Sequence, residues 1–195
     1  MDSVPKTSRQ LQAELTKRNI FDAAMRLLDT VDFEQITIRE IVKEANVSTG
    51  SFYHYYSSKM DVFYETYEIA DSYFDEKVRP QLTQQKATDR ILFFFSEYAK
   101  YSSVYTTYKL TKLLYNADNT WFHRSGSSML SILTGLCREA KESGEFSTEK
   151  TPEEIAVFLM VCARGIVYDW CLGGGTGDLA GTTGEYVGLL LSAFE

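Results

Sequence analysis

Residues 37–61 read TIREIVKEANVSTGSFYHYYSSKMD, and this stretch contains the boundaries of two short helices. Thr37 and Glu40, three residues apart, form a capping box, which is the side-chain pairing that begins a helix. Asn46 can adopt the left-handed backbone conformation that closes a helix, and Ser48 can cap a second one. The stretch therefore predicts two short helices joined by a tight turn.

A longer helix follows the second short helix almost at once. The first short helix is expected over 37–44 and the second over 48–55. Ser58 caps the next helix, with Asp61 three residues on, and apolar residues keep helical spacing to the neighbourhood of Lys77.

Apolar residues recur at helical spacing along the rest of the chain. One such stripe predicts a helix over 10–30, before the two short ones. Thr151, Pro152 and Glu154 give a clear helix start, and the GGGTG run at 173–177 ends that helix. The later helices are expected over 88–104, 105–116, 120–143, 152–172 and 184–194. Strand-like alternation is missing from the sequence, so the prediction is an all-α fold of about nine helices.

The charge of the chain is unevenly distributed. The 195 residues carry a formal net charge of −7. Residues 1–60 contain eight Lys/Arg and eight Asp/Glu and are neutral, whereas residues 61–195 contain twelve and nineteen, which gives 12 − 19 = −7. A polyanion would be tolerated by the first third and repelled by the remainder.

The composition indicates a cytoplasmic protein without a metal or a cofactor. The three cysteines form no C-x-x-C pair and only two histidines occur, so neither a zinc site nor a disulfide framework is expected. The amino-terminal segment MDSVPKTSRQ is polar and does not resemble a signal peptide. Apolar runs such as 155–163 are shorter than a membrane span.

Catalysis is not expected. The GGGTG run lacks the Gly-Lys-Ser/Thr of a phosphate-binding loop and follows a helix instead of a strand. With two histidines in the chain, no set of nucleophile, histidine and acid is visible.

The predicted elements follow the order found in helix-turn-helix proteins: a long helix, a short helix, a turn and a second short helix. Generic three-helix units share this order. By their spacing, Val47, Phe52 and Tyr56 should pack inward. The outward set is then Thr49, Gly50, Tyr53 and His54.

The sequence resembles the TetR family of bacterial transcriptional regulators. Residues 20–67, IFDAAMRLLDTVDFEQITIREIVKEANVSTGSFYHYYSSKMDVFYETY, are similar to that family's pattern of I-x-x-A-A-x-x-L, T-x-[RD]-x-I-A, S-x-G-[ST]-[LFI]-Y and S-K-x-[ED]-L. Departures occur at Val42, Asn46 and Tyr56, where the family often has alanine, glycine and phenylalanine. Beyond about residue 75 the resemblance is confined to helix order and to ARGIVYDWCLGG.

The resemblance implies a helix-turn-helix DNA-binding domain over 10–57 and a ligand-binding and dimerisation domain over 58–195, connected by the helix 58–77. It implies a homodimer on a near-palindromic operator, because two recognition helices would lie roughly 34–36 Å apart. It also implies a repressor that a small, apolar or aromatic effector releases. Activation of transcription, or a protein-interaction adaptor that has lost DNA binding, are the alternatives.

The candidate DNA contacts combine hydroxyl groups, helix starts and few charges. Lys17 and Arg18 can add phosphate contacts. With so few cations, about two to four phosphates should be neutralised in each half-site, which predicts a shallow salt dependence. The candidate contacts are Thr37, Arg39, Ser48, Thr49, Gly50, Ser51, Tyr53, His54, Tyr55 and Lys59.

The second domain is rich in aromatic residues, which can line a pocket or form an ordinary core. The candidate ligand-binding residues are Tyr98, Tyr101, Tyr105, Trp121, His123 and Tyr168. The last two helices are apolar on broad faces, which a dimer interface or the core can use. The candidate interface residues are Phe158, Ile166, Trp170, Val187, Leu190, Leu191 and Phe194.

Overall fold

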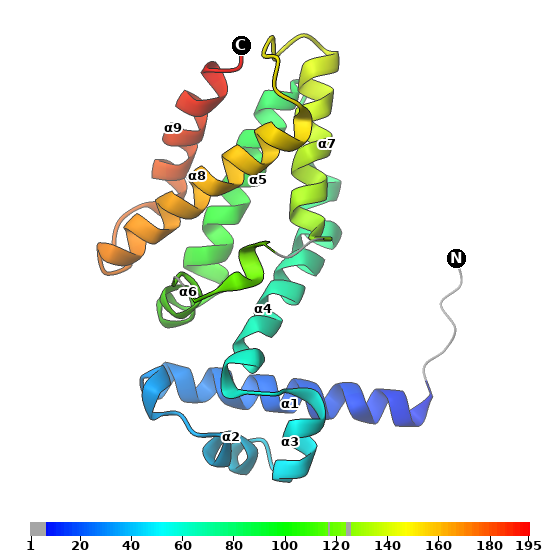
Figure 1. Cartoon of the computed structure of the whole chain (residues 1–195), viewed down its shortest axis with the longest axis vertical. Helices are drawn as coiled ribbons and strands as arrows, with labels where there is room; N and C mark the ends of the chain where they lie inside the picture. The colour runs from blue at the N-terminus through cyan, green and yellow to red at the C-terminus, as the bar shows by residue number, and fades with distance from the viewer. Residues whose placement is uncertain (1–6, 117, 124–125) are drawn as a thin grey trace. The chain divides into compact units, whose positions relative to one another are not determined.

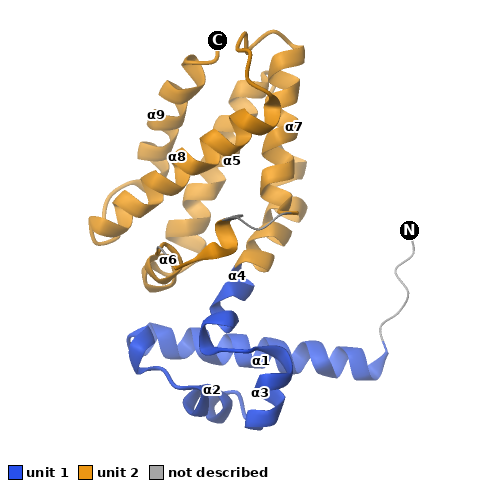
Figure 2. Cartoon of the chain, in the orientation of Figure 1, with its two compact units in different colours: residues 1–66 blue, residues 67–195 orange. Residues whose placement is uncertain are grey.

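The computed structural model describes residues 7–116, 118–123 and 126–195 (Figure 1). Across these residues the regular structure is helical, with nine α-helices and no strand. The predicted all-α fold is therefore confirmed. The chain divides into two compact units, one ending at Thr66 and the other beginning at Tyr67 (Figure 2).

The first unit contains the predicted short helices at the predicted places. The helix before them begins at Ser8, two residues earlier than expected, because Thr7 and Gln10 form a further capping box. The elements are α1 (Ser8–Thr30), η1 (Phe33–Gln35), α2 (Ile38–Glu44), α3 (Thr49–Tyr55) and the first part of α4 (Lys59–Tyr73).

A small core holds these helices together. Each of α1, α2 and α3 packs against the other two, and α4 adds Val62 and Phe63, both fully buried. The other members of this core are Ile20, Ala23, Ala24, Leu28, Ile36, Ile41, Val42, Ala45, Phe52 and Tyr56.

The boundary between the units falls inside α4. Its first turns, up to Thr66, belong to the first unit, and Tyr67 begins the second. The sequence placed the boundary at the start of this helix. Since apolar residues of the first turns complete the small core, the packing boundary lies further along the chain.

The second unit is built around four helices. In Figure 1, α5 (Ala87–Lys100) lies among α7 (Ser128–Glu142), α8 (Pro152–Leu172) and α9 (Leu179–Ser192). Both α5 and α8 pack against α7 and α9, and their facing side chains form one core that includes Phe94, Phe95, Leu159, Ala163 and Val187. Shorter elements complete the unit: η2 (Phe74–Val78), η3 (Arg79–Gln81), η4 (Tyr101–Tyr105), α6 (Tyr108–Leu114) and η5 (Thr120–His123).

One predicted helix, over 120–143, is wrong in its first part. Thr120–His123 is a separate 3₁₀ turn, and α7 begins at Ser128. Ser127 caps α7 and donates to Asp71 Oδ1 at 2.8 Å, and the amide of Met129 donates to the same oxygen at 3.2 Å. A carboxylate from a distant helix thus sets this boundary.

The last helix begins earlier than predicted, at Leu179 instead of residue 184. Asp178 caps it by accepting a hydrogen bond from the amide of Gly181 at 2.9 Å. A Cβ atom at position 181 would lie 2.3 Å from that carboxylate. Gly181 therefore permits the cap and does not break the helix.

Within the described residues, α8 is the one helix long and apolar enough to cross a membrane by length and composition. The sequence prediction considered only uninterrupted apolar runs and did not find it. The core helix of a soluble protein passes the same test, and α8 buries Ile155, Leu159, Ala163 and Val167 inside its own unit.

Glu145 supplies the cap for the start of α5 from a loop far along the chain. Its carboxylate accepts hydrogen bonds from the amides of Ala87 and Thr88, both at 2.9 Å, and from the Thr88 hydroxyl at 2.7 Å. The Ser143 hydroxyl adds a fourth at 3.0 Å. Burial opposes ionisation, but these hydrogen bonds outweigh it and lower the pKa of Glu145 to about 2.

Glu145→Gln should lower the free energy of unfolding at pH 7 by about 1–2 kcal/mol, because the amide accepts through one oxygen only. The folded-state pKa of Glu145 lies below its ordinary value of 4.5. The stabilisation is therefore complete above about pH 4.5 and is lost as the pH falls through about 2. Urea unfolding at pH 7 and at pH 3 measures both effects, and an equal gap between wild type and variant at the two values would contradict this role.

Candidate functional site

The turn between α2 and α3 has the geometry that its sequence predicts. Thr37 and Glu40 form the capping box of α2, with Thr37 Oγ1 and Glu40 Oε2 2.7 Å apart. Asn46 has a φ of 53° and closes α2. Ser48 Oγ accepts a hydrogen bond from the amide of Ser51 at 3.0 Å and begins α3.

Helix α3 has one buried face and one exposed face. Phe52 is fully buried and Tyr56, just beyond the helix, is 5% exposed. Val47, predicted to pack inward, is half-buried. The exposed residues are Ser48, Thr49, Gly50, Tyr53 and His54, with Ser51 and Tyr55 half-buried.

The fold itself does not require a glycine at position 50. Its backbone has ordinary helical geometry, and an added Cβ would meet only Ser48 Oγ, at an ordinary 3.7 Å. The absence of a side chain therefore leaves the outer surface of α3 open at its first turn.

The cations around this surface differ in how free they are. Arg39 is exposed in the first turn of α2 and makes no ion pair within the described part of the chain. Lys17 pairs with Glu65 at 2.9 Å and Arg18 lies 3.7 Å from Asp22. The ammonium of Lys59 is bound to backbone carbonyl groups of its own unit.

Tyr56 departs from the family pattern without leaving its hydroxyl unpaired. The hydroxyl donates to Glu65 Oε2 at 2.6 Å, and the same carboxylate oxygen pairs with Lys17. The ring packs on Phe52 with centroids 5.8 Å apart. Tyrosine is therefore accommodated here because α4 supplies an acceptor.

The second unit contains a polar pair inside its aromatic core. The hydroxyls of Tyr98 and Tyr115 lie 2.5 Å apart, and burial is the main cause that raises the pKa of both. Arg164 lies nearby on α8, donates to the carbonyl of Phe122 at 3.0 Å and stands over the Phe122 ring at 5.1 Å.

Tyr67, the first residue of the second unit, is held by the segment around η5. Asn119 Nδ2 donates to its hydroxyl at 2.5 Å. Trp121 stacks on its ring with centroids 5.8 Å apart, and Phe122 meets it edge-on at 5.4 Å. Phe122 also packs on Tyr115 at 5.0 Å, so ring contacts run from the tyrosine pair to α4.

A second cluster of tyrosines lies beside a buried carboxylate. Glu97 is 6% exposed and accepts from the Tyr73 hydroxyl at 2.9 Å and from Lys100 Nζ at 2.7 Å. Tyr73 packs on Tyr101 and Tyr105 with centroids 5.3 and 5.5 Å apart. The carboxylate is therefore buried beside these rings, whereas the side chain of its lysine partner is 41% exposed.

The structure does not gather the predicted ligand-binding residues around one cavity. Tyr98 lies in the core, Tyr101 and Tyr105 pack on Tyr73, and Trp121 stacks on Tyr67. Tyr168 is 49% exposed on α8. The side chain of His123 lies outside the described residues. Their role as ligand contacts stays a prediction.

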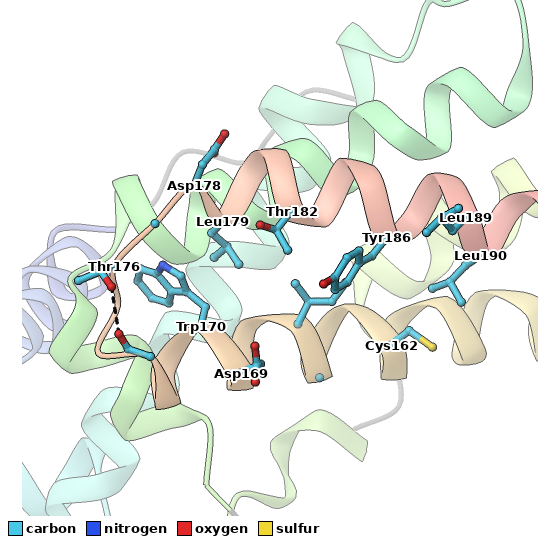
Figure 3. Close-up of a pocket in the computed structure, with 14 residues that line it drawn as sticks. Cys162, Asp169, Trp170, Thr176, Asp178, Leu179, Thr182, Tyr186, Leu189 and Leu190 are labelled. Atoms are coloured by element: carbon cyan, nitrogen blue, oxygen red, sulfur yellow. Dashed lines mark hydrogen bonds between the residues drawn. The ribbon is translucent and has the colours of Figure 1, made fainter.

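A pocket of about 660 Å³ lies between α8 and α9, and none of those six residues lines it. Figure 3 shows Trp170 and Tyr186 pointing into the space between the two helices. The indole N–H of Trp170 is buried and finds no acceptor among the described residues. Asp169 and Asp178 are the charged residues of a lining that is otherwise mostly apolar.

The surface at and beside this pocket exposes a row of large apolar side chains. On α8 they repeat at helical spacing, so they share one face. They are Val157, Phe158, Val161, Tyr168 and Leu172 on α8, and Tyr186 and Leu189 on α9. Of the predicted interface residues, Phe158 belongs to this row, Val187 and Leu191 are buried in the unit's own core, and Ile166, Trp170, Leu190 and Phe194 are half-buried against it.

Sequence reasoning missed Arg164, Glu97 and Asn119. Two of them carry a recognisable signal: Arg164 is the one basic residue of the apolar helix α8, and Glu97 interrupts the aromatic run of α5. A charge inside an apolar stripe is costly unless it is paired. Asn119 carries no such signal.

Comparison with known proteins bears on the first unit most directly. Residues 20–66 match the family model described as bacterial regulatory proteins, tetR family. The HTH-type transcriptional regulator AcrR of Shigella flexneri is 33% identical over 61 residues, which are 31% of this chain and 28% of that protein. The match thus spans less than a third of that relative.

Solved structures share the fold over about nine tenths of the chain. FadR from Bacillus subtilis in complex with stearoyl-CoA has a TM-score of 0.72 at 20% identity, over 91% of this chain and 99% of that one. Thermus thermophilus FadR in complex with lauroyl-CoA has a TM-score of 0.73 at 22% identity, over 90% and 92%. A SmeT–triclosan complex has a TM-score of 0.62 at 17% identity, over 91% and 90%.

Tyr115→Phe should lower the free energy of unfolding by about 1–3 kcal/mol, because it leaves the Tyr98 hydroxyl in the core without its partner. Tyr98→Phe added to that variant should restore part of the loss, since both polar groups are then gone. Urea unfolding of the single and double variants measures this. Losses that simply add would contradict a coupled pair.

Proposed function

The chain belongs to the TetR family of bacterial regulatory proteins by its amino-terminal unit, and we propose that it is a ligand-responsive repressor of transcription. In this proposal a homodimer binds a near-palindromic operator through α3 of each subunit, and a small effector bound in the second unit releases it.

The exposed face of α3 is the observation that carries the proposal. Thr49 offers a hydroxyl and a methyl group to base edges in a major groove. Gly50 lets the helix backbone approach the DNA closely. Tyr53, 56% exposed, extends from the same face and can reach bases or phosphates.

Few charges would support these contacts. Arg39 is the exposed cation best placed beside α3, at the start of α2, where the helix dipole also favours a phosphate. The hydroxyls of Ser48, Ser51 and Tyr55 can donate to phosphate oxygens without carrying charge. The proposal therefore includes the shallow salt dependence predicted from the sequence.

The proposed effector is apolar or aromatic and would bind within the second unit. The FadR structures named above were solved with acyl-CoA molecules and SmeT with triclosan. In this chain the aromatic core around Tyr98 and Tyr115, with Arg164 beside it, offers rings for an apolar body and polar groups for one end.

Release would follow from a shift between two states of the dimer. An effector that binds one state more tightly shifts the population towards it. Because α4 is one continuous helix across the two units, a displacement at Tyr67 would be transmitted to α3 and change the spacing of the two recognition helices.

The dimer is proposed to form through α8 and α9. Their exposed apolar row is the kind of surface that marks a protein interface, and the pocket of Figure 3 would receive side chains of the second copy. Val187 and Leu191 would support this interface from within the core instead of touching the partner.

Activation of transcription is the second candidate. A solved structure with a TM-score of 0.57 and 14% identity is described as the dihydroxyacetone kinase operon activator DhaS. The surface of α3 could bind DNA in a repressor or in an activator. Measuring transcription of the regulated genes in a strain that lacks this gene distinguishes the two.

Gly50→Ala tests the proposed contact with DNA. The added methyl group fits the fold, so the melting temperature should stay or rise, in line with a gain of about 0.5–1 kcal/mol in helix propensity. Affinity for a duplex selected by the wild-type protein from a random pool should fall at least about tenfold, since the backbone can no longer approach the groove.

Gly135→Ala, in the middle of α7, is the matched control, because a Cβ there meets nothing within 4 Å and therefore fits the fold, as it does at position 50. It should gain stability without losing affinity. If the wild-type protein selected no duplex at low salt, the regulator itself would be ruled out; equal affinities of the two variants would contradict the role of α3.

Leu189→Asp tests the proposed dimer. Leu189 is 66% exposed in the single chain, so the change should not disturb the core, yet the sedimentation mass should fall from twice 22.2 kDa to 22.2 kDa. Val104→Asp, at a side chain 71% exposed on η4, should leave the dimer intact. Dissociation by both variants, or by neither, would argue against this interface.

A further inference from the structure

Lys59 occupies an unusual place for a cation. It is the first residue of α4, and the start of a helix carries partial positive charge that disfavours an ammonium group. Its Nζ atom lies 2.7 Å from the carbonyl oxygen of Phe33 and 2.8 Å from that of Ile36. It also stands over the Phe33 ring, 4.1 Å from the centroid.

These contacts use most of the hydrogen-bonding capacity of the ammonium group. A lysine has three N–H donors; two point at carbonyl oxygens, and the ring face attracts the remaining positive charge. The Phe33 ring is itself fixed, since it meets Phe63 edge-on with centroids 5.6 Å apart, and Phe63 is fully buried. The site that binds Lys59 is therefore packed against the core of the first unit.

Phe33, Ile36 and Lys59 lie on either side of the two short helices in the sequence. Phe33 and Ile36 lie just before α2, and Thr37, the next residue, caps that helix. Lys59 lies just after α3. The hydrogen bonds of Lys59 therefore join the two ends of the segment 37–58, which contains α2, the turn and α3.

We infer that Lys59 is a positioning residue that closes the helix-turn-helix segment and that it does not contact a DNA phosphate. This inference rests on the proposed function, because it concerns how α3 is presented to DNA. It replaces the phosphate contact expected for Lys59 from the sequence. The hydrogen bonds of Lys59 hold the chain after α3 close to the start of α2. They therefore limit the conformations that the exposed face of α3 can adopt.

The two roles predict different salt dependences. A lysine that neutralises a phosphate contributes about 0.9 to the slope of log K against log salt concentration. A lysine that binds carbonyl groups inside the protein contributes nothing to that slope, but its loss lowers the affinity at every salt concentration.

The test compares Lys59→Met with wild type on a duplex selected by the wild-type protein, at a temperature where circular dichroism shows both folded. Affinity should fall about tenfold or more, as expected for losing hydrogen bonds to a charged group, while the slope stays within error. Arg39→Met is the matched control, since Arg39 is exposed and unpaired within the described residues; its slope should fall by about 0.9 for each arginine removed.

Lys59→Arg keeps the positive charge but changes the shape of the donor group, so it distinguishes the two roles. It also provides the test if Lys59→Met does not fold. Arginine binds phosphate at least as well as lysine, but its longer, planar guanidinium does not fit where a single Nζ atom lies 2.7 and 2.8 Å from two carbonyl oxygens. The inference predicts that Lys59→Arg loses affinity. Full affinity in Lys59→Arg, or a slope lowered by about 0.9 per subunit in Lys59→Met, would overturn it. Failure of the wild-type protein to bind any duplex would instead contradict the proposed function.

Discussion

Helices as short as α2 and α3 are unstable on their own, and this constraint shapes the first unit. Each has seven residues, well below the length at which an isolated helix persists in water. Their stability comes from the side-chain caps at Thr37 and Ser48 and from burial of one face of each, which carries Ile41 and Val42 on α2 and Phe52 on α3. Because α3 packs through that face only, the residues on its opposite face stay exposed. They are available to bind DNA.

The second unit meets a different demand. Its four long helices share one apolar core, and a few polar groups in or beside that core are paired with one another: Tyr98 with Tyr115, and Glu97 with Tyr73 and Lys100. Buried polar groups that satisfy each other specify one packing arrangement at little cost. The same groups are those to which an entering molecule could offer new partners, so a core of this kind suits a unit proposed to exist in two states.

The features that sequence predicted well are those whose physical cause is local. The capping boxes at Thr37 and Thr151, the closing turn at Asn46 and the buried face of α3 all depend on residues within one or two helical turns. The starts of α7 and α5 were less predictable, because Asp71 and Glu145 supply them from distant segments. The aromatic residues from Tyr98 to Trp121 could be recognised as numerous, but the sequence does not state which ring packs on which. Lys59 shows the same limit: its charge is visible, whereas the two carbonyl groups that bind it are brought near only by the fold.

The composition of α3 has a consequence for a bacterium in a changing environment. The helix contains neither lysine nor arginine among its seven residues. Under the proposed function, much of its grip on DNA would come from close fit and hydroxyl groups, whose strength depends little on dissolved ions. Osmotic stress raises the ionic strength of the cell interior and loosens proteins that hold DNA mainly by charge. A regulator built in this way would remain on its operator through such an episode and would continue to answer to its effector.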